Sequence, residues 1–312
     1  MTKKNDFKIG QCKLCLKDDT TLVDSHIIPD FVFRWLKKNS FNRYLRTSIV
    51  PNKRAQGGIT EKLLCEKCDN VTFGGELEAP FADTIFNPIL LKQKDSEPFI
   101  YDKVLLRFCV SVLWRVLIFG IEDAKKTKGL TVNLDTIILG MEDLANQWRE
   151  YLVDNQSSWT GLNVYFLRFG GAGLDPRDIG PGMHTYSQLT IDMGSFVDPY
   201  MWEPKIYAKL GPFVTFIPIT DYYLPLWEKE GISSLNENGG LLSFKGRKLP
   251  EHFKLFMQQR SDSSSGMFQR MSDIQKSKIL KIKNENLIEY EQSDEYLLAI
   301  KDIQEINLHD QS

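Results

Sequence analysis

Two Cys-x-x-Cys pairs near the start of the chain carry the residue types best suited to metal chemistry. Cys12 pairs with Cys15 and Cys65 with Cys68, which uses four of the five cysteines. Thiolates spaced in this way can close on one ion from a tight turn, and two such turns supply the four ligands of a tetrahedral zinc site. His26, the first of four histidines, lies between the pairs. The spacing therefore predicts a structural Zn²⁺ ion with an imidazole nearby.

Disulfide bonds are the alternative use of these cysteines, and the start of the chain argues against them. Residues 1–6 are polar and resemble no secretory segment. We therefore expect a cytoplasmic protein, in a reducing compartment where paired cysteines more often bind metal or take part in redox reactions. A thioredoxin-like redox motif would need a βαβ pattern beside one pair, and neither pair has one. Zinc is the favoured interpretation.

Several short motifs follow one another between residues 10 and 82. They are Cys12-x-x-Cys15, Ser25-His26-Ile27-Ile28-Pro29, Gly57-Gly58 and Leu63-Leu64-Cys65-x-x-Cys68-Asp69-Asn70. Their order and local spelling resemble the HNH family of ββα-metal endonucleases. The resemblance implies a zinc-stabilised, treble-clef-like ββα-metal module at the N-terminus, and it does not extend to the rest of the chain.

The resemblance implies a metal-dependent nuclease that hydrolyses phosphodiester bonds in DNA or RNA, with His26 as the general base. One histidine and one divalent metal can activate a water, polarise the phosphate and stabilise the leaving oxygen. Histidine suits the role of base because imidazoles titrate near neutral pH. The catalytic metal would be Mg²⁺ or another divalent ion. Bacterial proteins of this form often resemble components of antiviral systems, so the resemblance also suggests a role in antiviral defence.

Two positions differ from the family's pattern. The residue before the catalytic histidine usually binds the catalytic metal through a carboxylate or imidazole, and here it is Ser25. A hydroxyl is a poor lone ligand for Mg²⁺, which prefers carboxylate and water oxygens. Asp24 is adjacent, but on a strand it would face the opposite side from Ser25. The family's middle asparagine falls near Thr60 and Glu61.

Asp69 and Asn70 stand where the family places a metal ligand, directly after the second cysteine pair. Glu76 and Glu78 follow one to two helical turns later. A catalytic site could combine His26 with one residue of each of these two pairs, and the sequence does not select a unique set. Asp and Asn at such positions also cap helices, and the two glutamates equally suit a solvated helix face.

A basic run follows His26. The whole chain has a net charge of −2, but residues 1–65 carry thirteen Lys or Arg against six Asp or Glu, a net charge of +7. A field of this kind attracts a polyanion, and interleaved aromatic residues would suit stacking on bases. The alternative is a helix over residues 30–38 with a buried aromatic face. The predicted nucleic-acid-binding residues are Arg34, Lys37, Lys38, Arg43, Arg46, Lys53 and Arg54.

The length of 312 residues suits two domains, which we place at residues 1–85 and 86–312. The second is predicted to mix helices with antiparallel strands, so the fold class of the chain is α+β. A Ser-rich stretch at residues 261–266 is predicted to be a flexible linker before a helical C-terminal segment. Apolar periodicity predicts helices over 101–121 and 134–153, and strands over 162–169, 188–193 and 205–220, the last broken at Gly211-Pro212.

The most apolar stretch, residues 104–121, has the composition of a membrane span but not its pattern. Arg107, Ser111 and Arg115 recur at intervals of four residues and form a polar stripe along one side of a helix. We expect a buried amphipathic helix and no membrane contact.

Two functions of different classes remain open from the sequence. The first is an HNH-like nuclease whose larger domain supplies specificity or contacts a protein partner. The second is a zinc module that binds nucleic acid or a protein partner without cleavage, with Ser25 and Thr60 as signs of lost catalysis. His26 separates the two hypotheses, because only cleavage requires it.

Overall fold

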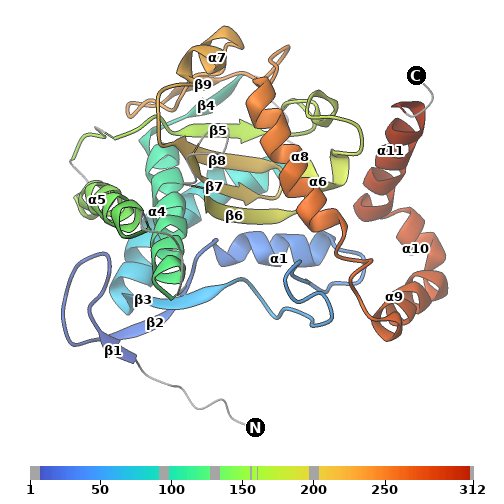
Figure 1. Ribbon diagram of the computed structural model, residues 1–312, viewed down its shortest axis with the longest axis horizontal. Helices are drawn as coiled ribbons and strands as arrows, with labels where there is room; N and C mark the ends of the chain where they lie inside the picture. Colours follow the sequence, from blue (N-terminus) through green and yellow to red (C-terminus); the bar gives the residue numbers. More distant parts are fainter. Residues whose placement is uncertain are drawn as a thin grey trace.

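The fold was obtained as a computed structural model that describes residues 8–90, 98–126, 134–154, 157–159, 161–196 and 204–309. Helices and antiparallel sheets are mixed along the chain, so the predicted α+β class is confirmed (Figure 1). Residues of both predicted segments contribute to one continuous hydrophobic core, which runs from Cys12 to Met257. The N-terminal segment and the rest of the chain are therefore packed directly against each other.

The N-terminal segment is a three-stranded antiparallel sheet followed by helices. Its strands are β1 (Lys8–Gly10), β2 (Thr20–His26) and β3 (Thr60–Cys65), in that order across the sheet. Leu22 of β2 and Leu64 of β3 are buried. Past Cys65 the chain turns directly into a continuous helical stretch, made of η1 (Lys67–Glu78), α2 (Ala79–Phe81), η2 (Ala82–Phe86) and α3 (Asn87–Leu90).

The long connection between β2 and β3 contains α1 (Asp30–Asn39), which begins after Pro29. Its ring-bearing side is turned inward: Phe31 and Trp35 lie 5.0 and 5.6 Å from the ring of Phe86. The predicted helix is present, and its aromatic residues Phe31, Phe33 and Trp35 are partly buried against the core. Stacking of aromatic residues on bases stays a prediction. The burial follows from helical spacing, which places residues four apart on one face.

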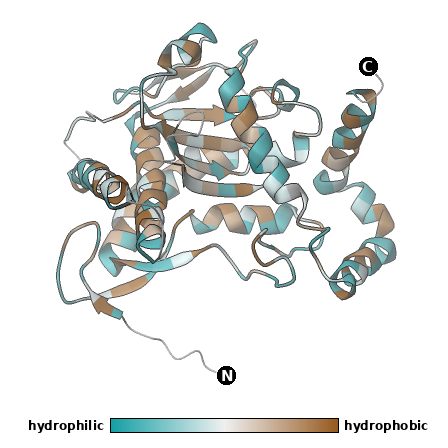
Figure 2. Cartoon of the chain, viewed as in Figure 1, coloured by the Kyte–Doolittle hydropathy of each residue, from teal (hydrophilic) through white to brown (hydrophobic). Residues whose placement is uncertain are grey.

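Helix α4 (Lys103–Lys126) runs through the centre of the protein, and α5 (Leu134–Val153) packs beside it, close to the predicted ranges (Figure 2). Among the described helices α4 alone is long and apolar enough to cross a membrane, and 78% of that window is buried in the protein. Its polar stripe also faces inward, because Arg107 donates to the carbonyls of Tyr151 and Leu152 at the end of α5, each at 3.0 Å.

A four-stranded antiparallel sheet forms the middle layer of the larger segment. Its strands β5 (Tyr165–Arg168), β6 (Ile191–Phe196), β7 (Lys205–Leu210) and β8 (Phe213–Pro218) lie in the order β5-β8-β7-β6. Helix α4 contacts one side, and α8 (Glu251–Ser265) stacks Phe253 on Phe216 at 4.6 Å. The two central strands are buried along their whole length, as expected for a sheet covered on both faces.

The predicted hairpin at Gly211 is confirmed, whereas the neighbouring strand prediction is partly wrong. Gly211 has φ +67°, and a Cβ there would lie 2.5 Å from the Trp35 ring, so this turn packs tightly against α1. The strand predicted from residue 188 begins only at Ile191, because the preceding residues form α6 (His184–Leu189).

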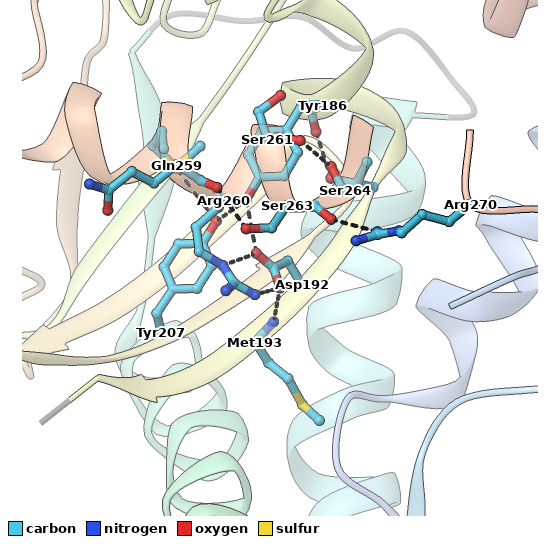
Figure 3. A network of polar contacts seen from close by, with 12 residues as sticks. Tyr186, Asp192, Met193, Tyr207, Gln259, Arg260, Ser261, Ser263, Ser264 and Arg270 are labelled. Atoms are coloured by element: carbon cyan, nitrogen blue, oxygen red, sulfur yellow. Dashed lines mark hydrogen bonds and ion pairs between the residues drawn. The ribbon is translucent and has the colours of Figure 1, made fainter. Parts of the chain in front are cut away.

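The Ser-rich stretch 261–266 is not a linker: residues up to Ser265 belong to α8. Its hydroxyls bond back to the helix, as when Ser263 Oγ donates to the Gln259 carbonyl at 2.9 Å. Just before this stretch, Arg260 donates two hydrogen bonds to Asp192 of β6, at 2.8 and 2.5 Å (Figure 3). Asp192 also accepts a hydrogen bond from the Tyr186 hydroxyl at 2.9 Å. This network anchors α8 to the sheet, which explains why serine-rich sequence is helical here.

The remaining elements are peripheral. Strands β4 (Phe99–Tyr101) and β9 (Gly240–Leu242) form a small antiparallel pair, and η3 (Pro176–Asp178) and α7 (Leu224–Lys229) are short helices. The C-terminal end is helical, as predicted, and consists of α9 (Asp273–Glu285), α10 (Leu287–Glu291) and α11 (Asp294–His309).

Candidate metal centre and histidine site

The two cysteine pairs meet in space, as their spacing predicts. The four Sγ atoms of Cys12, Cys15, Cys65 and Cys68 lie within 4.8 Å of one another, and this group can hold a metal such as zinc. The Sγ atoms of Cys15 and Cys65 are 3.9 Å apart, close to the roughly 3.8 Å edge of a tetrahedron with Zn–S bonds of about 2.3 Å. These cysteines are free thiols, so the disulfide alternative is wrong.

Local backbone geometry brings the pairs together. The first pair sits in a tight turn in which the Leu16 amide donates to the Cys12 carbonyl at 2.9 Å and Leu16 takes φ +58°. The amide of Cys65 donates to Cys12 Sγ at 3.3 Å, which joins the turn to the end of β3. Cys68 lies in the first turn of η1. Burial and the crowding of neighbouring thiols raise the pKa of Cys68, an effect that a bound cation would oppose.

His26 ends β2, opposite Thr60 of β3, with about one third of its side chain exposed. Its Nε2 atom lies 3.6 Å from Oδ1 of Asp30 in the first turn of α1. The other Asp30 oxygen accepts from Arg34 at 2.7 Å. The imidazole is thus reachable from solvent on one side and faces a carboxylate on the other.

Asp69 follows Cys68 in η1 and faces the end of β2. Burial raises the pKa of Asp69, and the Ser25 hydroxyl, Arg115 and His26 each act to lower it. These four groups therefore lie close enough to influence one another electrostatically. The structure therefore places Asp69 near His26, as the sequence predicted. It also places Asp69 beside Ser25, which the sequence did not predict.

The other candidate ligands are placed less favourably. Asn70 is exposed. The N-cap of η1 is Glu66, and no side chain forms a capping hydrogen bond there, so the prediction that Asp69 or Asn70 caps the helix is wrong. Glu76 is exposed, while Glu78 is engaged by Arg115 at 2.7 Å.

Asp24 faces away from Ser25, as predicted for neighbouring residues of a strand. It is exposed and pairs with Lys62 of β3 at 3.1 Å. It is therefore no substitute for the missing family ligand at the Ser25 position.

Arg115 lies on the predicted polar stripe of one helix, but its contact with the end of β2 was not predicted from the sequence. Arg115 belongs to α4, is 1% exposed, and donates through Nη1 to the His26 carbonyl at 2.9 Å and to Glu78 at 2.7 Å. The larger segment thereby holds the end of β2 and the end of η1 together. The available signal was an arginine in an otherwise apolar helix, since fully buried arginines are nearly always paired.

Two buried polar atoms near Asp69 make no hydrogen bond of ordinary geometry within the described residues, namely Ser25 Oγ, which lies beside the Asp69 carboxyl group, and Arg115 Nη2. Buried polar groups are normally satisfied, so such atoms mark a place for a water, an ion or a ligand oxygen. Mg²⁺ is commonly held by one or two carboxylates together with waters and substrate phosphates. Asp69 with the Ser25 hydroxyl fits that pattern, although the four cysteines are the only group of three or more clustered Cys, His, Asp or Glu ligands in the described part of the chain.

The predicted nucleic-acid-binding residues divide into two groups. Four have contacts within the protein: Arg34 with Asp30, Lys37 with the Gln56 carbonyl, Arg46 with the Pro51 carbonyl, and Arg54 over the Tyr44 ring. The other three, Lys38, Arg43 and Lys53, are exposed. This second group is the part of the basic run most available to a polyanion.

Comparison with known proteins adds no relative. No family model, curated protein or solved structure matches the chain significantly. The function is therefore argued from the geometry of the site.

Proposed function

We propose that the protein is a metal-dependent HNH-like endonuclease that hydrolyses phosphodiester bonds in DNA or RNA. The observation that supports this most is the convergence of His26, Ser25 and Asp69 beside the four-cysteine group. In this proposal the hairpin of β2 and β3 and the following helix form a zinc-stabilised, treble-clef-like ββα-metal module. Zinc has a structural role there, and antiviral defence is the proposed setting.

His26 is the proposed general base. Its exposed edge admits a water, and the imidazole takes one proton from that water as its oxygen attacks phosphorus. Asp30, at 3.6 Å from Nε2, then stabilises the imidazolium. The bond from Arg115 to the His26 carbonyl fixes the backbone at this point, which limits the freedom of the ring.

Asp69 and Ser25 would hold the catalytic divalent metal. Such an ion supplies a Lewis acid for the phosphate and for the departing oxygen. The partly buried Asp69 carboxylate is the anionic anchor, and the Ser25 hydroxyl is a neutral neighbour. Lys38, Arg43 and Lys53 would bind phosphates of the nucleic acid on the exposed side of the connection between β2 and β3.

The test compares wild-type protein with His26→Ala on plasmid DNA and on structured RNA, with Mg²⁺, Mn²⁺, Ni²⁺ or Zn²⁺ added. We expect the substitution to lower the cleavage rate by about 10²–10⁴-fold, the usual contribution of a general base. Binding of nucleic acid should be unchanged, because the basic residues are untouched. His309→Ala, an exposed histidine at the end of α11, is the matched control and should cleave normally.

A non-catalytic zinc module that binds nucleic acid or protein is the second candidate. It is favoured by Ser25 at the position of a family ligand and by the engagement of Glu78 with Arg115. Wild-type protein that cleaves neither substrate with any of the four metals, yet binds with steep salt dependence, would support this candidate and refute the nuclease.

A further inference from the structure

The three C-terminal helices α9, α10 and α11, which we call the C-terminal arm, carry several large apolar side chains that are exposed to solvent. No residue of α9 or α10 is buried, and Leu298 is the buried residue of α11. Ile274 and Ile288 are 68% and 73% exposed. Leu280, Leu297 and Ile303 are also about half exposed or more. Apolar surface can mark an interaction site, and here exposed apolar residues recur on all three helices of the arm.

The inner side of the arm contacts the body of the protein. Asp302 of α11 accepts from the backbone amides of His184 and Thr185 at 2.7 and 3.0 Å, and Glu305 pairs with the His184 ring at 2.7 Å. In the middle of the arm Tyr290 packs on Phe41 with ring centroids 5.2 Å apart, and near the start of α9 Gln275 accepts a hydrogen bond from Arg46 Nη2 at 3.1 Å. The arm is therefore fixed to the body at both ends, with its outer side turned to solvent (Figures 1 and 2).

The charges of the arm are divided between its two ends. Helix α9 carries four Lys against one Asp and one Glu, a net charge of +2. Helices α10 and α11 together carry six Asp or Glu against one Lys, a net charge of −5. Asp302, Glu305 and Glu295 are engaged within the protein, which leaves Glu289, Glu291 and Asp294 as the carboxylates outside those contacts. An arm that is positive over α9 and negative over α10 and α11, with exposed apolar residues on all three helices, can be complementary to itself after a two-fold rotation.

We propose that this arm is a dimerisation surface whose occupant is the arm of a second copy of the chain. In the two-fold arrangement α9 of each copy faces α10 and α11 of the other. Exposed Lys278 and Lys281 then oppose exposed Glu289 and Glu291, and the apolar residues are buried between the two arms. The inference does not depend on the nuclease proposal, although a dimer would carry two His26 sites.

The test uses two charge-reversal variants of the full chain, Lys278→Glu with Lys281→Glu, and Glu289→Lys with Glu291→Lys. Molar mass is measured by light scattering and sedimentation over a range of micromolar concentrations. The wild type is expected to be a dimer, and each variant to dissociate with a Kd raised about tenfold or more by like charges. An equimolar mixture of the two variants should dimerise again, because opposite charges then meet.

Lys245→Glu with Lys248→Glu is the matched control, since it makes the same charge change on exposed residues after β9 and should leave the dimer intact. Recovery in the mixture also shows that the variants are folded. A wild type that is monomeric throughout would overturn the proposal and leave the arm for a different partner. A dimer insensitive to both reversals, or a mixture that stays monomeric, would overturn it as well.

Discussion

Cys68→Ser is expected to release the zinc and to unfold the N-terminal segment. Cys68 lies in the first turn of η1 and joins that helix to the turn and the strand that carry the other three thiols. Structural zinc in small modules contributes about 10–16 kcal/mol of apparent binding free energy, which is comparable to the whole free energy of unfolding of a native protein, about 5–15 kcal/mol. The measurements are zinc content after gel filtration and the rate of limited proteolysis of residues 8–90.

Two variants make the cysteine prediction specific. Cys109 is fully buried in α4, outside the four-cysteine group, so Cys109→Ser should retain one zinc per chain. His26→Ala should also remain folded, because its imidazole is partly exposed and Asp30, which faces it, is also held by Arg34. Equal solubility and equal protease resistance of Cys68→Ser and His26→Ala would show that the cysteines do not hold a structural ion.

Arg115→Met is expected to destabilise the protein by about 3–5 kcal/mol, the usual cost of removing one partner of a buried ion pair. The substitution leaves the Glu78 carboxylate, which is 18% exposed, and the His26 carbonyl without their donor. Cleavage should fall as well, because the backbone at His26 loses its support. Urea unfolding gives the stability, and the zinc content should stay at that of the wild type.

A double-mutant cycle tests whether this loss arises from the pair. Arg115→Met combined with Glu78→Met removes both charges, so the double variant should lose less stability than the sum of the single variants. Strictly additive losses would mean that Glu78 and Arg115 do not stabilise each other. Arg115→Lys keeps the charge but not the forked geometry, and we expect it to be intermediate.

The parts of the fold that depend on local patterns could be predicted from the sequence. The range of α5 and the turn at Gly211 follow from apolar periodicity and from the backbone freedom of glycine. The four-cysteine group was predictable because two cysteines separated by two residues can bind one ion from the same turn. A tetrahedral zinc site needs four ligands, and two such pairs supply them.

The remaining features depend on partners that are distant in sequence. The Ser-rich stretch is helical because α8 is tied to β6 through Arg260 and Asp192, which lie 68 residues apart. Arg115 reaches His26 across 89 residues, so no local pattern connects them. Asp69 could be placed after the second cysteine pair from sequence, but its proximity to Ser25 depends on the packing of η1 against β3 and α4.

One metal ion is expected to join the end of β3, the turn at Cys12 and the start of η1, and thereby to hold Asp69 beside His26. X-ray absorption at the zinc edge of freshly purified protein tests this directly. We predict one zinc per chain with four sulfur neighbours at about 2.3 Å. Protein without bound zinc, or zinc surrounded by nitrogen and oxygen, would contradict it.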